Sequence, residues 1–288
     1  MAGRNERQRR QARERYRRQQ EQRVSRQRQV RQRWLIGLSG VLVLALAGSL
    51  LAVFLPSGKP KKPAAAASKS PSASPTASAT AVAEPAHHCS YTSATPVAKK
   101  VSLPPAAPDY TNSYQATINT SQGKITFNLL NSKATCTVNS FIHLAEAGYF
   151  NNTQCHRLLT SGIYVLQCGD PYATASSKLN CSTTSKIGTG TPGYDFASEN
   201  LKGAKYPAGT VAMANEGSAN TNGSQFFIVY KDSTSGLTAS YTPFATVSSG
   251  LGIVQNVAKG GYSCQYAQAG GGVPKKKVII DSVTIKKT

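Results

Sequence analysis

The chain is poor in acidic residues: its 288 residues include 12 Asp and Glu against 33 Lys and Arg, a formal net charge of +21. The surplus is uneven, because residues 1–33 hold 13 Arg and 3 Glu. This basic segment has very few apolar residues, so it cannot build a core of its own. A nucleic-acid-binding arm is one interpretation of such a run, and a cytoplasmic tail beside a membrane is the other.

Cysteine pairs at metal-binding spacing are also lacking. The sequence contains no C-x2-C pair, and the His-His-Cys stretch at 87–89 has no second cluster at ligand spacing, which argues against a zinc site. Gly188-Thr189-Gly190 resembles a phosphate loop, but it follows no strand-to-helix pattern. We therefore expect neither a metal nor a cofactor.

One long apolar run follows the basic segment directly. Residues 34–55 are 22 residues without a charge, and as a helix they would span roughly 30 Å, the thickness of a bilayer core. The sequence predicts a single-pass transmembrane helix here, with residues 1–33 in the cytoplasm and the remainder extracytoplasmic. The alternative is a cleaved signal peptide, whose apolar region is usually shorter, about 7–15 residues.

The remaining chain divides by composition. Residues 56–109 are rich in Pro, Ala, Ser and Thr and have no periodic apolar face, so they are predicted to be a disordered linker. Residues 110–288 shift towards Val, Ile, Tyr, Phe and Gly, which favours strands. Alternating apolar residues predict hairpins over 114–130 and 153–170, and helical spacing predicts helices over 135–147 and 250–260.

Three stretches carry a family resemblance: CHRLLTSGIYVLQCGD (155–170), GTVAMANEGSANTNGSQFFIVY (209–230) and PFATVSSGLGIVQNV (243–257). Within the second, M-A-N followed by T-N-G-S-Q-F-F is the most specific. Over roughly residues 114–288 the chain resembles the cyclophilin family of peptidyl-prolyl cis-trans isomerases. The resemblance implies a mainly β fold, a closed eight-stranded antiparallel β-barrel capped by two α-helices.

The resemblance also implies the site. Arg157 matches the catalytic arginine, and Gln167 matches the residue that orients it. An arginine suits the task because it keeps its charge and presents a rigid fork of donors. Positions that match the substrate-binding residues, or lie next to them, are Tyr164, Val165, Met213, Ala214, Asn215, Gln225, Phe227, Leu237 and Tyr241. Phe226 points the other way along the strand and is expected in the core.

Four positions depart from the common family pattern. The segment from Arg157 to Gln167 is two residues longer, and Tyr241 stands where many members have His. Ser235 or Gly236 falls where many members have Trp, and Glu216 replaces a small residue. The missing indole implies that a cyclosporin-type ligand binds only weakly.

Six cysteines allow 15 pairings, and thiols beyond the membrane can be oxidised. The second predicted hairpin places Cys155 opposite Cys168, within disulfide reach. A shift of register by a residue or two leaves Cys89 or Cys136 as a competing partner. Cys181 and Cys264 lie outside the family motifs and are candidates to pair with each other.

The resulting hypothesis is a membrane-anchored isomerase that needs no cofactor and accelerates the folding of secreted or cell-envelope proteins. Its partners would be proline-containing peptides, unfolded secreted proteins and, through residues 34–55, the lipid bilayer. No nucleic acid is expected as a partner of the folded domain. The alternative is a non-catalytic proline-peptide-binding or chaperone module on the same fold.

Overall fold

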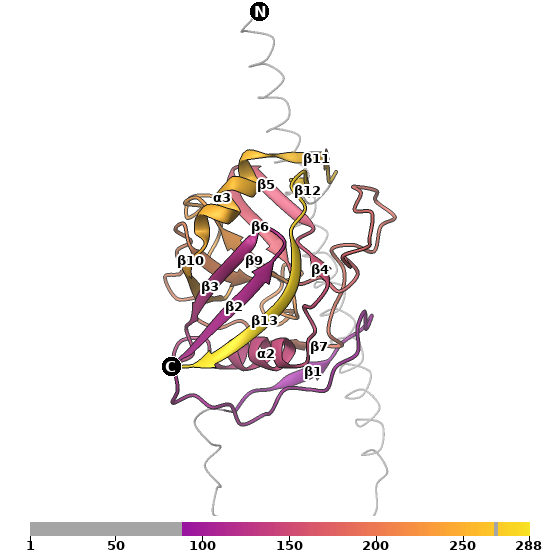
Figure 1. Cartoon of the computed structure of the whole chain (residues 1–288). Coiled ribbons are helices and arrows are strands. Elements are labelled where there is room, and N and C mark those ends of the chain that lie inside the picture. Colours follow the sequence, from indigo (N-terminus) through magenta and orange to yellow (C-terminus); the bar gives the residue numbers. More distant parts are fainter. Residues whose placement is uncertain (1–87, 268–269) are drawn as a thin grey trace, which may run out of the picture. The chain divides into compact units, whose positions relative to one another are not determined.

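A computed structural model describes residues 88–267 and 270–288 of the chain (Figure 1). This part is mainly β, as predicted, and it contains thirteen strands and two helices. The helices are α2 (Thr135–Glu146) and α3 (Leu251–Lys259). The strands are β1 (Tyr91–Ser93), β2 (Tyr114–Thr120), β3 (Gly123–Leu129), β4 (Thr153–Gln154), β5 (Arg157–Ser161), β6 (Ile163–Cys168), β7 (Tyr194–Phe196), β8 (Thr210–Met213), β9 (Phe226–Val229), β10 (Pro243–Ser249), β11 (Tyr262–Gln265), β12 (Gly272–Pro274) and β13 (Ile279–Lys287).

Eleven strands form one antiparallel sheet in the order β11-β12-β5-β6-β9-β8-β10-β3-β2-β13-β4. Both predicted hairpins, β2–β3 and β5–β6, are present with the expected turns. Gly123, at the first turn, has φ of 121°, a conformation that glycine adopts without steric cost. Figure 1 shows α2 and α3 at opposite ends of the sheet.

The predicted closed eight-stranded barrel is not what the pairing shows, because the strand order is open and ends at β11 and β4. The last strand, β13, pairs with β4 over only two residues, Ile279 with Gln154 and Ile280 with Thr153. The chain then passes through Cys155 and His156 before β5 joins β6. The ladder is therefore interrupted at the place where a barrel would close.

Two apolar clusters lie on opposite faces of β5, β6, β8 and β9, because successive side chains on a strand alternate in direction. The inner cluster contains Phe226, Leu158 and Leu166 together with Phe141 of α2 and Val254 of α3. The outer cluster is smaller, and its buried members are Leu159, Val165, Tyr206, Ala212, Phe227 and Val229. Phe226 therefore faces the core, as predicted, and Phe227 faces the other way.

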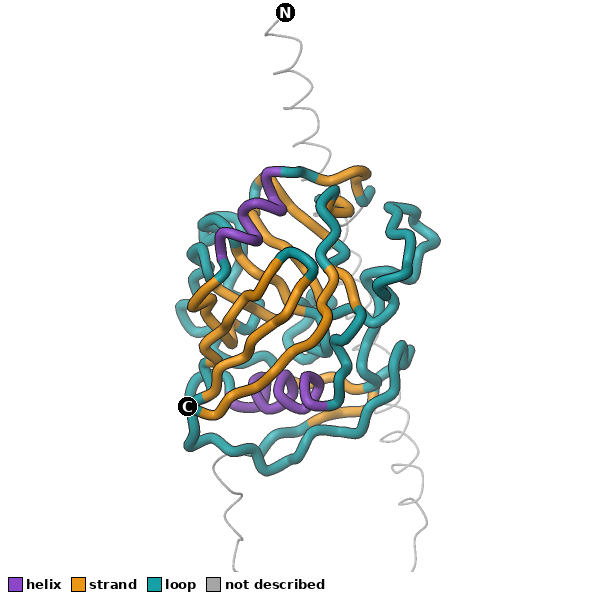
Figure 2. The backbone as a smooth tube through the Cα atoms, viewed as in Figure 1, coloured by secondary structure: helices purple, strands orange, loops and turns teal. Residues whose placement is uncertain are grey.

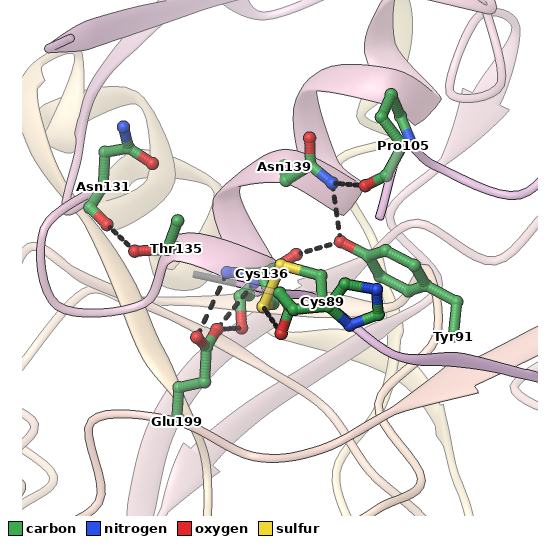
Figure 3. Close-up of a disulfide and its surroundings, with 10 residues drawn as sticks. Cys89, Tyr91, Pro105, Asn131, Thr135, Cys136, Asn139 and Glu199 are labelled. Atoms are coloured by element: carbon green, nitrogen blue, oxygen red, sulfur yellow. Dashed lines mark hydrogen bonds between the residues drawn. A yellow bond between two sulfur atoms is a disulfide. The ribbon is translucent and has the colours of Figure 1, made fainter. Parts of the chain in front are cut away.

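The N-terminus of α2 is held by a residue distant in sequence. Its first residues are preceded by Ala134, whose side chain makes no capping hydrogen bond. Instead, the backbone amides of Cys136 and Thr137 donate to the Glu199 carboxylate at 3.1 and 2.7 Å (Figure 3). The carboxylate satisfies amides that have no partner within the helix and complements the positive end of the helix dipole.

Residues 88–109 are not a disordered linker, which corrects the prediction for this part of 56–109. β1 pairs with β7, and Cys89 forms a disulfide with Cys136 at the start of α2. The Tyr91 hydroxyl donates to the Cys136 carbonyl at 2.8 Å, and Asn139 donates to the Pro105 carbonyl at 2.8 Å (Figure 3). Figure 2, in the same view as Figure 1, shows this segment passing below α2. We call residues 88–109 the strap.

Three disulfides join all six cysteines: Cys89–Cys136, Cys155–Cys168 and Cys181–Cys264. The expected pair across the second hairpin is confirmed, and so is the pair outside the family motifs. The strap disulfide removes Cys89 and Cys136 as competing partners of the hairpin cysteines.

The predicted tail (1–33), the predicted transmembrane helix (34–55) and the linker up to residue 87 lie outside the described residues. Within residues 88–267 and 270–288, neither helix is both long enough and apolar enough to span a bilayer.

Candidate active site

A chain of hydrogen bonds runs from Arg157 across the outer face of the sheet. Arg157 Nη1 donates to Gln167 Oε1 at 3.0 Å, and Gln167 Nε2 donates to Gln225 Oε1 at 2.9 Å. On its other edge, Arg157 Nε donates to the Gly270 carbonyl at 3.0 Å. The guanidinium is thus held from two sides, and its plane is set by groups that the sheet and the β11–β12 connection position.

The strand register explains why these residues meet. Arg157 lies opposite Gln167 in the β5–β6 ladder, and Gln167 lies opposite Phe227 in the β6–β9 ladder. Phe227 in turn lies opposite Ala212 in the β8–β9 ladder. Side chains directly opposite one another in a ladder point to the same face. The cationic group and the apolar cluster therefore lie side by side.

Phe227 is a buried member of the outer cluster, and it is 5% exposed. Half-buried Ala214, Leu237 and Tyr241 pack against this cluster at its rim. The Tyr241 ring stands 5.5 Å from the Phe227 ring, centroid to centroid, at an angle of 80°. Four of the predicted apolar residues, Val165, Phe227, Leu237 and Tyr241, are therefore brought together, and Ala214 joins them.

Two predicted residues are not part of this wall. Tyr164 lies on the opposite face of β6, where its ring contacts Tyr230 at 6.0 Å between centroids. Met213 is buried in the inner cluster. Their neighbours Ile163 and Ala212 contact the outer cluster instead. Counting in steps of two back from Gln167 would have found Ile163, because that spacing keeps one face of a strand.

Two departures from the family pattern, the longer β5–β6 hairpin and the missing Trp near residue 236, are in contact in the structure. The longer β5–β6 hairpin brings its turn against Gly236, where a Cβ would lie 2.5 Å from the Gly162 carbonyl oxygen and 2.6 Å from Ile163 Cγ2. A side chain at residue 236 would force this hairpin to shift. The hairpin therefore supplies, through Ile163, apolar surface at a position where an indole is absent.

A polar groove of about 80 Å³ lies beside the outer cluster. Its lining includes Gln167, Ala214, Asn215, Glu216 and Gln225. Asn215 Nδ2 donates to the Ser240 carbonyl at 2.8 Å, and its Oδ1 accepts from the Gly217 amide at 3.0 Å. Ala214, Asn215 and Gln225, which match positions that bind a peptide backbone, therefore line one groove together, and Glu216 adds a carboxylate.

The opposite wall of this groove is a ridge that sequence reasoning missed, residues 188–190. Gln225 Nε2 donates to the carbonyls of Gly188 and Gly190, both at 3.1 Å. Beneath the ridge, the buried Asp170 carboxylate accepts from the amides of Gly188 and Tyr172. Burial raises the pKa of Asp170, and these amide hydrogen bonds oppose the rise. The residues after the second hairpin therefore brace the ridge.

His156 precedes Arg157 and is 2% exposed. Neither ring nitrogen has a hydrogen-bond partner within the described residues. Burial, and secondarily the charge of Arg157, lower the pKa of His156 to about 3. The imidazole is therefore neutral at ordinary pH, and its charge does not compete with that of Arg157.

Comparisons with known proteins identify the family to which the chain belongs. A model of the family described as "Cyclophilin type peptidyl-prolyl cis-trans isomerase/CLD" matches residues 115–285. The "Probable peptidyl-prolyl cis-trans isomerase B" of Mycobacterium leprae is 42% identical over 217 residues, which cover 69% of this chain and 66% of the relative. The protein of the same name from Mycobacterium tuberculosis is 40% identical over 218 residues, covering 69% and 64%. The matches thus span slightly less than two thirds of these relatives' own length.

A solved structure of a cyclophilin type peptidyl-prolyl cis-trans isomerase from Cryptosporidium parvum is 26% identical, with a TM-score of 0.48, and covers 61% of this chain and 99% of that one. The family model, by contrast, matches well over half of the 288 residues and includes Arg157, Gln167 and Phe227. The chain belongs to the cyclophilin-type peptidyl-prolyl cis-trans isomerase family.

Proposed function

We propose that the described domain is a peptidyl-prolyl cis-trans isomerase. The observation that carries the proposal is the fixed Arg157 guanidinium, bound to Gln167 and Gly270 and placed beside the outer cluster around Phe227. An apolar slot next to a positioned cation is what a prolyl bond requires. The slot takes the proline ring, and the cation faces the amide nitrogen.

The chemistry needs no covalent intermediate and no proton transfer. Rotation about the amide faces a barrier of about 18–20 kcal/mol because of resonance. In the twisted state the prolyl nitrogen becomes pyramidal and gains a lone pair, which a charge-assisted donor can stabilise. The planar amide offers no such acceptor. Arg157 would therefore bind the transition state more tightly than either ground state, and this difference is the source of catalysis.

Each neighbouring group has a part in this step. Gln167 would hold the guanidinium plane, and Gln225, tied to the 188–190 ridge, would fix Gln167 in turn. Asn215 and the Ala214 backbone form the edge along which the peptide backbone would lie. The neutral His156 would keep a second positive charge away from the reacting amide.

The test is a proline-isomerisation assay with the full chain in detergent micelles, using a peptide in which alanine flanks the proline. We expect acceleration that is proportional to enzyme concentration. A chain that binds the peptide but leaves the uncatalysed rate unchanged would be a proline-peptide-binding or chaperone module, and the proposed activity would be wrong.

We further propose that the protein is anchored by residues 34–55 with the isomerase domain outside the cytoplasm, where it would act on secreted or cell-envelope proteins. The uncharged run after the arginine-rich tail supports the orientation. Three disulfides support an oxidising compartment. Protease added to intact cells should remove the domain. Protection until the membrane is broken would reverse the orientation, and release into the medium would show cleavage.

A further inference from the structure

A second hollow of about 300 Å³ lies beside Arg157, and neither Ala214 nor Asn215 lines it. Two segments that are distant in sequence enclose it. One is the loop around residues 181–189, and the other is the stretch around Tyr266 and Ala267. Its lining residues are His156, Arg157, Gln167, Cys181, Ser182, Thr183, Ile187, Gly188, Thr189, Tyr266 and Ala267. None of the predicted substrate-binding residues is among them.

A disulfide joins these two segments, and hydrogen bonds fix the second segment to the rest of the domain. The Cys181–Cys264 disulfide joins them across a sequence separation of 83. The Tyr266 hydroxyl donates to the His156 carbonyl at 3.1 Å, and the Tyr266 amide donates to the Gly271 carbonyl at 2.9 Å. The hollow is therefore bounded by tied segments of the chain, and its wall does not depend on apolar packing alone.

The hollow is adjacent to the path of a bound peptide. Gln167, Gly188 and Thr189 line both it and the polar groove, so the ridge at 188–190 separates the two. A proline over Phe227 has the Ala214 edge on one flank and Arg157 on the other. A peptide that lies along the Ala214 edge would leave the site past Arg157. One of its flanking side chains would then reach the hollow.

The charge of the lining favours an acidic side chain. Arg157 contributes a positive charge, His156 is neutral, and no lining residue is acidic. The carboxylate nearest in sequence to this wall, Asp170, is buried and accepts amide hydrogen bonds from Gly188 and Tyr172. The Thr183 hydroxyl adds a hydrogen-bond donor to the lining, whereas the Thr189 hydroxyl donates to the Lys186 carbonyl at 2.7 Å.

We propose that this hollow, which we call the disulfide-bounded subsite, binds an acidic side chain that flanks the proline of the substrate. The inference rests on the proposed function only for the place of the proline. The subsite predicts a substrate preference: peptides with Glu or Asp beside the proline should bind more tightly than peptides with Lys there. The preference would come from the loop around 181–189 and its partner segment.

The experiment measures binding, so that it stands apart from the isomerase assay. Fluorescent peptides carry Ala-Pro with Glu, Gln or Lys placed one or two residues before or after it, and anisotropy with the full chain gives each Kd. We expect Glu to bind about tenfold more tightly than Lys on one flank only, with Gln between them. Equal Kd values for Glu and Lys on both flanks would overturn the proposal.

Two variants locate the preference. Thr183→Glu places a negative charge in the lining and should reduce the Glu-over-Lys ratio at least threefold, because two like charges within several ångströms repel measurably. The matched control is Thr284→Glu, which makes the same charge change on an exposed position of β13. Equal ratios in the two variants would assign the preference to overall charge and overturn the subsite.

A third experiment removes the Cys181–Cys264 disulfide. Cys181→Ser with Cys264→Ser should flatten the Glu-over-Lys ratio towards one, whereas Cys89→Ser with Cys136→Ser should keep it. A chain that shows the preference but no isomerisation would retain the subsite and lose the proposed function. A chain that isomerises Ala-flanked peptides but binds Glu and Lys peptides equally would retain the proposed function and lose the subsite.

Discussion

The outer cluster around Phe227 and the disulfide-bounded subsite lie on either side of Arg157, but they are built differently. The outer cluster consists mainly of strand residues whose direction follows from register. The subsite is formed largely by loop residues that a disulfide brings together. A ladder positions side chains through many neighbouring hydrogen bonds, whereas a loop needs a specific tie. In this domain the sheet therefore positions the outer cluster, whereas a disulfide positions the subsite.

This contrast predicts different responses to mutation. Substitutions in the outer cluster should affect every prolyl peptide, since the proline ring is common to all of them. Changes to the cross-linked side should affect discrimination among peptides.

Removing the strap disulfide should lower the free energy of unfolding more than the other substitutions considered, and it should change the isomerisation rate little. Cys89→Ser with Cys136→Ser opens a loop of sequence separation 47, and loop-closure entropy gives a loss of about 4 kcal/mol in the free energy of unfolding. Denaturant unfolding under non-reducing conditions measures it. The isomerisation rate at a temperature where the variant is folded should stay within about twofold of wild type. A large loss of rate in the folded variant would show that the strap supports catalysis.

Arg157→Ala should lower kcat and kcat/KM together by roughly thirtyfold to a thousandfold, with KM little changed. The charge-assisted hydrogen bond is available only in the twisted state, and it is worth about 2–4 kcal/mol in a partly dry pocket. Phe227→Ala is the contrasting variant, because it removes the slot in both states and should raise KM as well. An Arg157→Ala variant with the wild-type rate would refute the electrostatic mechanism and leave the family assignment intact.

A cyclosporin-type ligand should bind more weakly than to family members with Trp at the rim. Gly236 offers no indole N–H, and the turn at Gly162 fills the adjacent space. The loss of one hydrogen bond and its packing corresponds to about 1–3 kcal/mol, or roughly tenfold to a hundredfold in Kd. Calorimetric titration measures this. Tight binding would mean that Ile163 and its hairpin replace the indole in full.

His156 should make the domain lose stability in mild acid. The pKa of His156 is lowered to about 3 in the folded state, whereas the unfolded chain takes up a proton near the ordinary value of about 6.5. The stabilising contribution is therefore complete above pH 6.5 and decreases as the pH falls towards 3. Between pH 8 and pH 5 the unfolding free energy should fall by about 2 kcal/mol relative to His156→Gln.

Asp170, whose pKa shifts in the opposite direction, is present in both proteins, so its effect cancels in that difference. Denaturant midpoints measured at several pH values provide the comparison. Parallel pH dependence of wild type and His156→Gln would show that His156 is solvated in the folded domain.

Much of the candidate site could be predicted from sequence. The family motifs named Arg157, Gln167, Gln225 and Phe227, and the structure brings these four residues together. Tyr164 and Met213 lie next to the residues of the wall and not among them, because adjacent residues on a strand point to opposite faces: Tyr164 adjoins Ile163, and Met213 adjoins Ala212. Shifting a strand by one residue turns a side chain to the other face.

The strap and the second hollow could not be predicted for a different reason. The composition of 88–109 is that of a linker, and nothing local in it indicates the Cys89–Cys136 bond or the pairing of β1 with β7. The subsite likewise depends on the bond between Cys181 and Cys264. Contacts between residues this far apart leave no periodic signal in either segment.

The sequence by itself therefore determined the strand-rich domain, its two helices and the family motifs around Arg157 and Phe227, because hairpins and amphipathic helices follow from short-range periodicity. Only the tertiary structure decided that the sheet is open at β4, that Ile163 replaces Tyr164 at the wall, and that two distant loops enclose a hollow beside Arg157. Those outcomes depend on long-range register and on which cysteines meet. Both are properties of the folded chain as a whole.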